Sequence, residues 1–460
     1  MRSARYTTVV VAFIAMLLGS AALFAGKGLP NPLLTTSSTG VLATYTTNKG
    51  IDINNPFFQN LGSNGRTCNS CHISTSAWTI TPADVQAKFK ATQGTDPIFR
   101  PNDGSNCPSA DVSTVQARRK AYSQLLSKAL IRVSVPLPAN AEFQIVDIQD
   151  PYSCPETTAT NPAMYRRPLP ATNLRFLSTI MWDGRETVFG AIPGKSIDMT
   201  QSLSNQAIDA TTGHAQGAKP TPQQVADIVA FETGLYTAQI SDRHAGSLTA
   251  QGAHGGPLSL SRQSSFIGIN DPFGGNPTGA EFDANAFTLY GSWANVGSPY
   301  RQSVARGEDL FNNLPISITG VGGLNDALNQ PVMMGTCTTC HDTPNAGNHS
   351  VSVPLAIGTT AHPAISALDT AGLPVYTIRC NTTGALVQVT DPGRAMISGK
   401  CADLGKLKGP VLRGLAARAP YFHNGSAATL NDAVDFYDQR FNLNLTPQQK
   451  ADLVAFLQTL

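Results

Sequence analysis

The chain has 460 residues, 41% of them hydrophobic, and a formal net charge of +2. This length allows two or three domains, and the composition is that of a globular protein. A nearly balanced charge is not that of a nucleic-acid binder or a polybasic membrane-surface protein, so we expect no nucleic-acid partner. Forty glycines and 31 prolines predict that loops make up much of the chain.

The N-terminus has the pattern of an export signal. Arg2 and Arg5 precede an apolar run, which predicts a signal peptide over residues 1–25 with cleavage after Ala22 or Ala25. The run is almost long enough to cross a bilayer, so an uncleaved N-terminal anchor is the alternative, and we expect membrane attachment only in that case. Export places the protein in the periplasm.

Two distant stretches share one pattern, "TCNSCHIS" at 67–74 and "TCTTCHDT" at 336–343. Two cysteines three positions apart, followed directly by a histidine, are the signature of c-type haem attachment, with the histidine as the proximal iron ligand. A zinc site needs four ligands, and a redox dithiol lacks the adjacent histidine, so both alternatives fit less well. The sequence therefore predicts two covalently bound haem c groups, on Cys68, Cys71 and His72 and on Cys337, Cys340 and His341.

The four remaining cysteines are Cys107, Cys154, Cys380 and Cys401. An even remainder in an exported chain indicates disulfides, and four cysteines allow three pairings. We favour the pairing of sequence neighbours, 107 with 154 and 380 with 401, because each bond closes a Pro/Gly-rich insertion. Buried free thiols are the alternative.

An insertion over about residues 100–160 follows the first motif. Within it, the amphipathic stretch 114–130 predicts one helix, and the segments 130–138 and 142–148 predict a small hairpin. Further along, residues 237–300 are rich in Gly, Ser and Pro without helical periodicity, which predicts a structured linker.

One helix is repeated, as "TPQQVADIVAFETGLY" (221–236) and "TPQQKADLVAFLQTL" (446–460). Both copies place Thr at the N-cap and Pro at the first helical position, and each follows one haem motif. The predicted fold class is therefore mainly α and loop-rich. Two cytochrome c-like haem domains lie in tandem, at 40–236 and 301–460, and the first carries a small β-containing insertion.

The repeat also predicts that the two haems differ. When Leu203 is aligned with Leu430, Ala210 meets Tyr437. One half thus offers a side chain able to bind iron where the other offers a methyl group. We expect the second haem to be capped and the first to be open.

Three stretches resemble the bacterial di-haem cytochrome c peroxidases and their MauG-type relatives: "MWDGRE" (181–186), the pair at 206–207, and "LKGPVLRGLAARAPYFHNGSAATLNDAVDFY" (407–437). The resemblance implies a high-spin first haem that meets peroxide or oxygen and a low-spin second haem that relays electrons. It also implies that Trp182 lies between the haems and that Gln206 belongs to the distal pocket. Tyr437 would be the axial ligand of the second haem, with Met396 as the rival ligand.

The resemblance further brings in one calcium ion as a candidate cofactor, at the carbonyls of Arg418 and Pro420. Arg167 or its neighbours stand where the family has a calcium-binding Asn, which puts the ion in doubt.

Two departures from the family pattern concern the first haem. The family's capping His has no counterpart near Lys88, so the site is expected to be open without reductive activation. The family's distal Glu is replaced by Gln216. Cleavage of the O–O bond needs a group that moves a proton, and His214 is the titratable side chain nearby, with a surface loop His as the plain alternative.

These features predict an exported di-haem cytochrome c peroxidase-like oxidoreductase. It would reduce hydrogen peroxide, or use it to oxidise a partner, at the first haem, with electrons relayed through the second. Expected partners are hydrogen peroxide or oxygen and a small redox protein, a cytochrome c or a cupredoxin, or a substrate protein. An electron-transfer cytochrome with both haems capped and an oxygen-dependent di-haem oxygenase are the alternatives.

Overall fold

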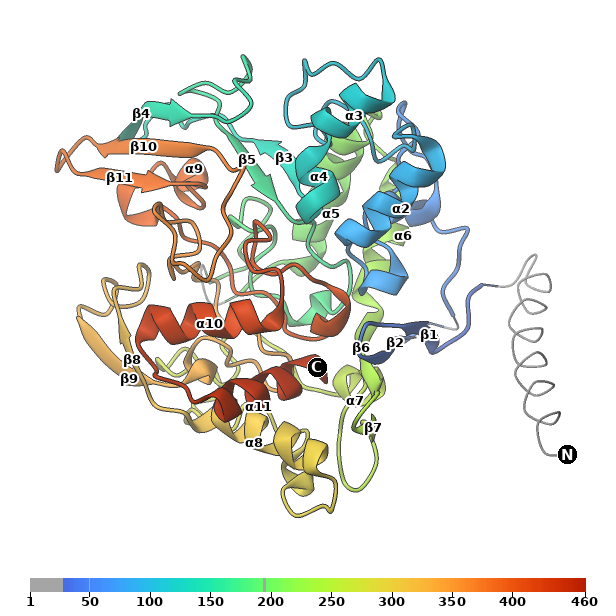
Figure 1. Cartoon of the computed structure of the whole chain (residues 1–460), viewed down its shortest axis with the longest axis vertical. Coiled ribbons are helices and arrows are strands. Elements are labelled where there is room, and N and C mark those ends of the chain that lie inside the picture. Colours follow the sequence, from blue (N-terminus) through green and yellow to red (C-terminus); the bar gives the residue numbers. More distant parts are fainter. Residues whose placement is uncertain (1–27, 49, 193–195) are drawn as a thin grey trace, which may run out of the picture.

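The computed structural model describes residues 28–48, 50–192 and 196–460 (Figure 1). The expected signal peptide lies outside these described residues. Across the described part of the chain, none of the helices is both long and apolar enough to cross a membrane. The same residues form ten α-helices and four small antiparallel sheets, so the fold contains more sheet than the mainly α prediction allowed.

The largest sheet joins the N-terminal segment to the end of the first repeated helix. Its strands, in the order β1-β2-β6-β7, are β1 (Leu33–Thr36), β2 (Gly40–Thr46), β6 (Leu235–Asp242) and β7 (Gly246–Ser247). Inside this region, the buried hydroxyls of Thr44, Thr172 and Thr237 form a chain of hydrogen bonds at 2.9 Å. Buried hydroxyls need such partners, so the chain fixes the sheet against the segment after the insertion.

Three helices surround the first haem motif: α2 (Pro82–Thr92), α5 (Met199–Asp209) and α6 (Pro222–Thr233). The first repeated helix forms as predicted, because the Thr221 hydroxyl accepts from the Gln224 amide and caps α6. Phe57, Trp78 and Phe231 pack with ring centroids 4.9–6.0 Å apart and join α6 to the motif segment. These aromatic contacts position the helix beside the motif.

Residues 114–130 form two short helices instead of the single helix predicted: α3 (Val115–Ala121) and α4 (Ser123–Lys128). The break has a local cause. The Asn106 amide donates to the carbonyl of Ala121 at 2.7 Å, and the Asn106 side chain accepts from the amide of Gln124 at 3.2 Å. Both groups are thereby withdrawn from the regular helical ladder.

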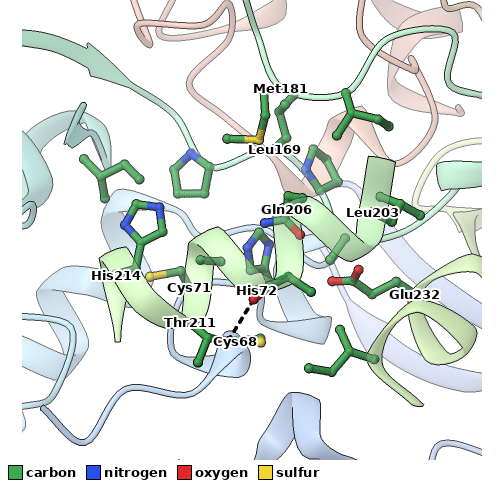
Figure 2. A pocket seen from close by; sticks show the side chains of 18 of the residues that line it. Cys68, Cys71, His72, Leu169, Met181, Leu203, Gln206, Thr211, His214 and Glu232 are labelled. Carbon is green, nitrogen blue, oxygen red and sulfur yellow. Dashed lines mark hydrogen bonds between the residues drawn. The ribbon is translucent and has the colours of Figure 1, made fainter. Parts of the chain in front are cut away.

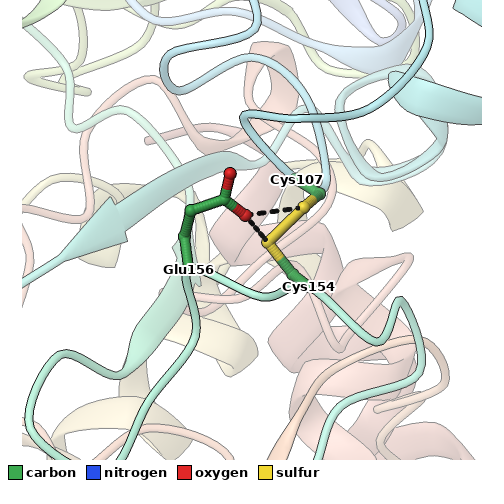
Figure 3. A group of neighbouring side chains, drawn as sticks. All are labelled: Cys107, Cys154 and Glu156. Carbon is green, nitrogen blue, oxygen red and sulfur yellow. Dashed lines mark hydrogen bonds between the residues drawn. A yellow bond between two sulfur atoms is a disulfide. The ribbon is translucent and has the colours of Figure 1, made fainter.

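Both favoured disulfides, Cys107–Cys154 and Cys380–Cys401, are present, which confirms the predicted pairing. The carboxylate of Glu156 lies 3.1 and 2.9 Å from the sulfurs of the first disulfide (Figure 3). Because those sulfurs are bonded to each other, neither is a thiolate that binds a metal.

The hairpin predicted within residues 130–148 is wrong. The pairs that form instead are β3 (Ile131–Ser134) with β5 (Ala163–Arg166), and β10 (Val375–Cys380) with both β4 (Phe143–Gln149) and β11 (Leu386–Val389). Pro136 and Pro138 lie between β3 and β4, and proline has no amide proton for a ladder, so the chain leaves the sheet instead of turning back. The insertion is therefore joined to the C-terminal half by main-chain hydrogen bonds (Figure 1).

The C-terminal half contains the remaining elements. They are α7 (Pro257–Ser261), α8 (Pro299–Asn313), β8 (Ile316–Thr319), β9 (Val332–Gly335), α9 (Ala395–Ser398), α10 (Leu430–Phe441) and α11 (Pro447–Gln458). The second repeated helix, α11, forms as predicted and crosses α8 closely at Gly307. A Cβ atom there would lie 2.0 Å from the Asp452 carbonyl oxygen, so the crossing requires glycine. Arg306 donates two hydrogen bonds to the Asp452 carboxylate, at 2.8 and 2.9 Å.

Candidate functional site

The first motif begins in a tight 3-10 turn over Cys68–Ser70. The amide of His72 donates to the carbonyl of Cys68 at 3.0 Å, which folds the histidine back onto the turn. Nδ1 of the same imidazole lies 3.0 Å from the carbonyl oxygen of Trp78. A carbonyl only accepts, so Nδ1 carries the proton and Nε2 keeps the lone pair that binds a metal.

The second motif repeats this geometry. It begins in a 3-10 turn over Cys337–Thr339, and the amide of His341 donates to the carbonyl of Cys337 at 3.0 Å. Nδ1 of His341 donates to the carbonyl of Gly347 at 2.6 Å. The two histidines are therefore oriented alike, each with Nε2 left for a ligand bond.

Burial sets the charge state of both motifs. It lowers the pKa of His72 to about 4 and also lowers the pKa of His341. It raises the pKa of the Cys68 and Cys337 thiols to about 12. Neutral imidazoles are the form that binds iron, and each motif supplies one.

Each motif borders its own cavity. The first encloses about 1390 Å³ and the second about 1570 Å³, with open solvent at their mouths included, and both are lined mainly by apolar side chains. Within the described residues, the motif cysteines are the ones outside the disulfides. Two thiols, a neutral imidazole and an apolar space are what a covalently attached haem requires, so the residues present fit one haem at each motif.

Helix α5 and the π-helical turn that follows it, Ala210–His214, form one wall of the first cavity (Figure 2). The predicted residues Gln206 and His214 both lie in this wall. Gln216, at the position of the family's distal Glu, is exposed and accepts a hydrogen bond from Asn64 at 3.3 Å. His214 is thus the titratable side chain that this wall presents. The π turn, a geometry that recurs at functional sites, was not foreseen from the sequence.

The buried ion pair of Asp103 and Arg66 contacts the imidazole of His214. Nδ1 of the imidazole contacts the carboxylate of Asp103, which also binds the guanidinium of Arg66. Burial alone would raise the pKa of Asp103, but the hydrogen bonds and charges of its two partners lower it, so this carboxylate is ionised at neutral pH. Sequence inspection missed both partners, because they lie more than a hundred residues before the histidine.

Glu232 is a second acid of the first cavity (Figure 2). It comes from the last turn of α6, is 5% exposed, and its Oε2 has no hydrogen-bond partner among the described residues. Burial raises its pKa to about 8. In the helical repeat its counterpart is Leu457, which lines the second cavity. A comparison of the two copies could have found this acid.

Trp182 and Lys408 each line both cavities. The indole of Trp182 donates to the carbonyl of Arg167 at 2.8 Å, and its ring lies edge-on to His423 with centroids 6.2 Å apart. The ammonium of Lys408 donates to the carbonyl of Thr179 at 3.1 Å, and burial lowers its pKa to about 7. The predicted tryptophan therefore lies between the two cavities, beside a lysine that the sequence did not single out.

The two residues predicted as rival axial ligands at the second motif lie in different places. Tyr437, on α10, lines the second cavity, and burial raises the pKa of its hydroxyl group. Ala210, its counterpart in the repeat, lines the first cavity. Met396 packs instead in the core between α9 and strands β4 and β10, against Phe143 and Tyr376. The fold thus brings the tyrosine to the second motif.

The residues at the implied calcium site do not fit the ion. The guanidinium of Arg167 donates to the carbonyl oxygens of Arg418 and Lys128, each at 3.0 Å. Burial and the neighbouring Arg418 lower the pKa of Arg167 to about 9, which leaves it charged at neutral pH. Calcium needs six to eight oxygen ligands, and here a fixed cation already binds a carbonyl that would supply one.

No family model matches the sequence. Among curated proteins, the chain is 33% identical over 141 residues to cytochrome-c peroxidase IdrP2 of Denitromonas iodatirespirans, a match that covers 27% of this chain and 36% of that protein. It is 39% identical over 69 residues to cytochrome c551 peroxidase of Nitrosomonas europaea, covering 15% and 21%. The chain thus spans about a third or less of the curated relatives it matches.

Among solved structures, a MauG-like protein associated with microbial copper homeostasis aligns with 95% of this chain and 94% of its own, at 16% identity and a TM-score of 0.39, a likeness too low to support an inference. The sequence matches are to named cytochrome-c peroxidases and agree with the motifs quoted above. Over these segments, the chain is similar to bacterial cytochrome-c peroxidases, in agreement with the resemblance that the motifs indicate.

Proposed function

We propose that this chain is an exported di-haem c-type oxidoreductase that reduces hydrogen peroxide at the first cavity. The observation that carries the proposal is the difference between the cavities at matched positions. At the repeat position where Tyr437 lies in the second cavity, the first cavity has Ala210, whose methyl group cannot bind iron. A relay protein has both haems capped, and an enzyme leaves one open to substrate.

Haem, when bound at these motifs, supplies the iron and the electrons of the reaction. Reduction of one hydrogen peroxide to two waters also takes two protons, and the chain's own residues must handle them. His214 lies in the first cavity with Nδ1 engaged by Asp103, so its Nε2 accepts a proton from one peroxide oxygen and delivers it to the departing oxygen. Gln206, an amide with donors and an acceptor, orients the bound peroxide.

Electrons reach the first cavity from the second by way of Trp182, which lines both. Its indole hydrogen bond to the Arg167 carbonyl holds the ring in place. The donor is a small redox protein, a cytochrome c or a cupredoxin. Tyr437 is the residue that would bind the iron of a haem in the second cavity, where its phenolate would lower the potential because it stabilises ferric iron.

The periplasm is the proposed location. The two disulfides favour an oxidising compartment, and c-type motifs accompany export. The alternative is a reaction with oxygen in place of peroxide, and the test below distinguishes the two.

The test is a stopped-flow reaction of the as-isolated ferric protein with hydrogen peroxide, followed with and without a reduced cytochrome c. We expect a rapid spectral change at one haem and peroxide-dependent oxidation of the cytochrome. His214→Gln should slow the first change about 10²-fold or more while haem content stays at two per chain. Absence of any reaction with peroxide in the unmodified protein would contradict the proposal.

A further inference from the structure

The insertion after the first haem motif contributes a carboxylate to the first cavity. Asp103 lies within the turn that begins at Pro101, and its side chain is 8% exposed. One carboxylate oxygen contacts Nδ1 of His214, which lies 111 residues further along the chain. The other oxygen binds the guanidinium of Arg66, directly before the motif. Three separate segments thus meet at one ionised group.

Arg66 is itself fixed in position. Its guanidinium donates to the carbonyls of Pro97 at 2.9 Å and Ile98 at 2.7 Å, and to the carbonyl of His214 at 3.0 Å. A side chain that is 4% exposed and has this many partners holds one geometry. The side-chain amide of Asn64 donates to the same His214 carbonyl at 2.8 Å. Both the backbone and the ring of His214 are therefore anchored to residues outside its own helix.

The contact with Asp103 also fixes the chemistry of the imidazole. An ionised carboxylate only accepts hydrogen bonds, so Nδ1 of His214 donates and Nε2 keeps its lone pair. A proton taken up at Nε2 makes the ring cationic, and the adjacent carboxylate stabilises that charge. The other charged or titratable side chains that line the first cavity, besides the motif cysteines, are Arg66, His72, Arg166, Arg167, Arg185, Glu232 and Lys408.

We propose that Asp103, held by Arg66, is a positioning residue that keeps His214 in the tautomer able to take a proton from the substrate in the first cavity. The proposal rests on the function proposed above. It gives the insertion a catalytic purpose. The insertion supplies a carboxylate to the first cavity, whereas Gln216, at the position of the family's distal Glu, is exposed and has none. In the step itself, Nε2 of His214 would take a proton from one peroxide oxygen and return it to the other, which leaves as water when the O–O bond breaks. A haem held by Cys68, Cys71 and His72 would supply the two electrons for that cleavage.

Asp103→Asn tests the proposal, with Asp111→Asn as a control that makes the same change at an exposed site in the same insertion. An asparagine amide can donate to Nδ1 and so favours the wrong tautomer. We expect the peroxide reaction of Asp103→Asn to slow about 10²-fold. The pH profile of the rate should also differ from that of the unmodified protein, because a negative charge beside the imidazole is lost. The control should match the unmodified protein.

Cyanide association gives a second readout, since hydrogen cyanide must lose a proton to bind as the anion. Asp103→Asn should slow this association as well, and in a His214→Gln background it should have no further effect. A rate and pH profile equal to those of the unmodified protein would overturn the proposal, whereas an unmodified protein that reacts with neither ligand would overturn the proposed function instead.

If Asp103→Asn does not accumulate as folded protein, a measurement on the unmodified protein tests the proposal. In the reduced, CO-bound form, which is diamagnetic, ¹⁵N NMR of labelled histidine reports the tautomer of His214. We expect the proton on Nδ1 in a hydrogen bond to Asp103. A proton on Nε2 would contradict the proposal.

Discussion

Glu232→Gln removes the acid that the first cavity buries without a hydrogen-bond partner for Oε2 among the described residues. Burial raises the pKa of Glu232 from 4.5 to about 8. The folded protein then holds this proton up to about pH 8, whereas the unfolded chain releases it near pH 4.5. Unfolding free energy therefore falls as the pH rises across that window, by about 1.4 kcal/mol for each pH unit. The total loss is on the order of 4 to 5 kcal/mol.

Glutamine is neutral at every pH and escapes this loss. We expect Glu232→Gln and the unmodified protein to have similar unfolding free energies at pH 4.5 to 5, and the variant to be more stable at pH 8 by several kcal/mol. Denaturant unfolding at several pH values measures the difference directly. Glu281→Gln, at an exposed site, is the control and should show no pH-dependent difference. A constant difference between Glu232→Gln and the unmodified protein from pH 5 to pH 8 would refute the reasoning.

Three further predictions follow from the second cavity and the region between the cavities. Tyr437→Phe should change the EPR signal of one ferric haem and raise its reduction potential, since phenolate stabilises ferric iron, whereas Met396→Ala should leave both unchanged. Trp182→Phe should leave haem content at two per chain but slow oxidation of the second haem after peroxide is added, as measured by stopped-flow spectroscopy. An unchanged rate would exclude the indole from the electron-transfer path between the haems. Chelation of calcium should change neither the melting temperature nor the peroxide reaction, because Arg167 already binds the Arg418 carbonyl, and loss of activity restored by added calcium would contradict this.

Local patterns predicted the elements whose causes are local. The Thr-Pro-Gln-Gln starts of α6 and α11 cap their own helices, as predicted. The two motif turns also close on local residues, because the amide of Thr67 donates to the Ser70 hydroxyl and that of Thr336 to the Thr339 hydroxyl. Disulfide pairing also followed from sequence proximity. In these cases the residues that determine the structure lie within one or two turns of each other, or are sequence neighbours among the cysteines, separated by 47 and 21 residues.

The predictions of secondary structure failed where a segment's structure depends on residues outside it in the sequence. β4 pairs with β10, more than two hundred residues away, so the hairpin expected from adjacent β-like segments did not form. The helix expected over 114–130 is broken by hydrogen bonds from Asn106, which lies outside it. Such pairing leaves no periodic trace in either segment.

The first cavity also contains contacts between distant residues that the sequence did not predict. His214 was a candidate on its position after Gln206, but nothing near it in the sequence indicates that Asp103 and Arg66 hold it. Glu232 differs, because the repeat already places it against Leu457, and a polar residue at one copy of a core position is a visible signal.

Ligand binding by the as-isolated ferric protein tests the central claim most directly: that the first haem is open and the second is capped. Cyanide or azide is added without prior reduction, and optical and EPR spectra are recorded at each concentration. One high-spin haem should convert to a low-spin complex with a stoichiometry of one ligand per chain, because the first cavity has Ala210 at the position matched to Tyr437, while the haem beside Tyr437 stays unchanged. Two low-spin haems that bind neither ligand would contradict the enzyme function and leave an electron-transfer cytochrome.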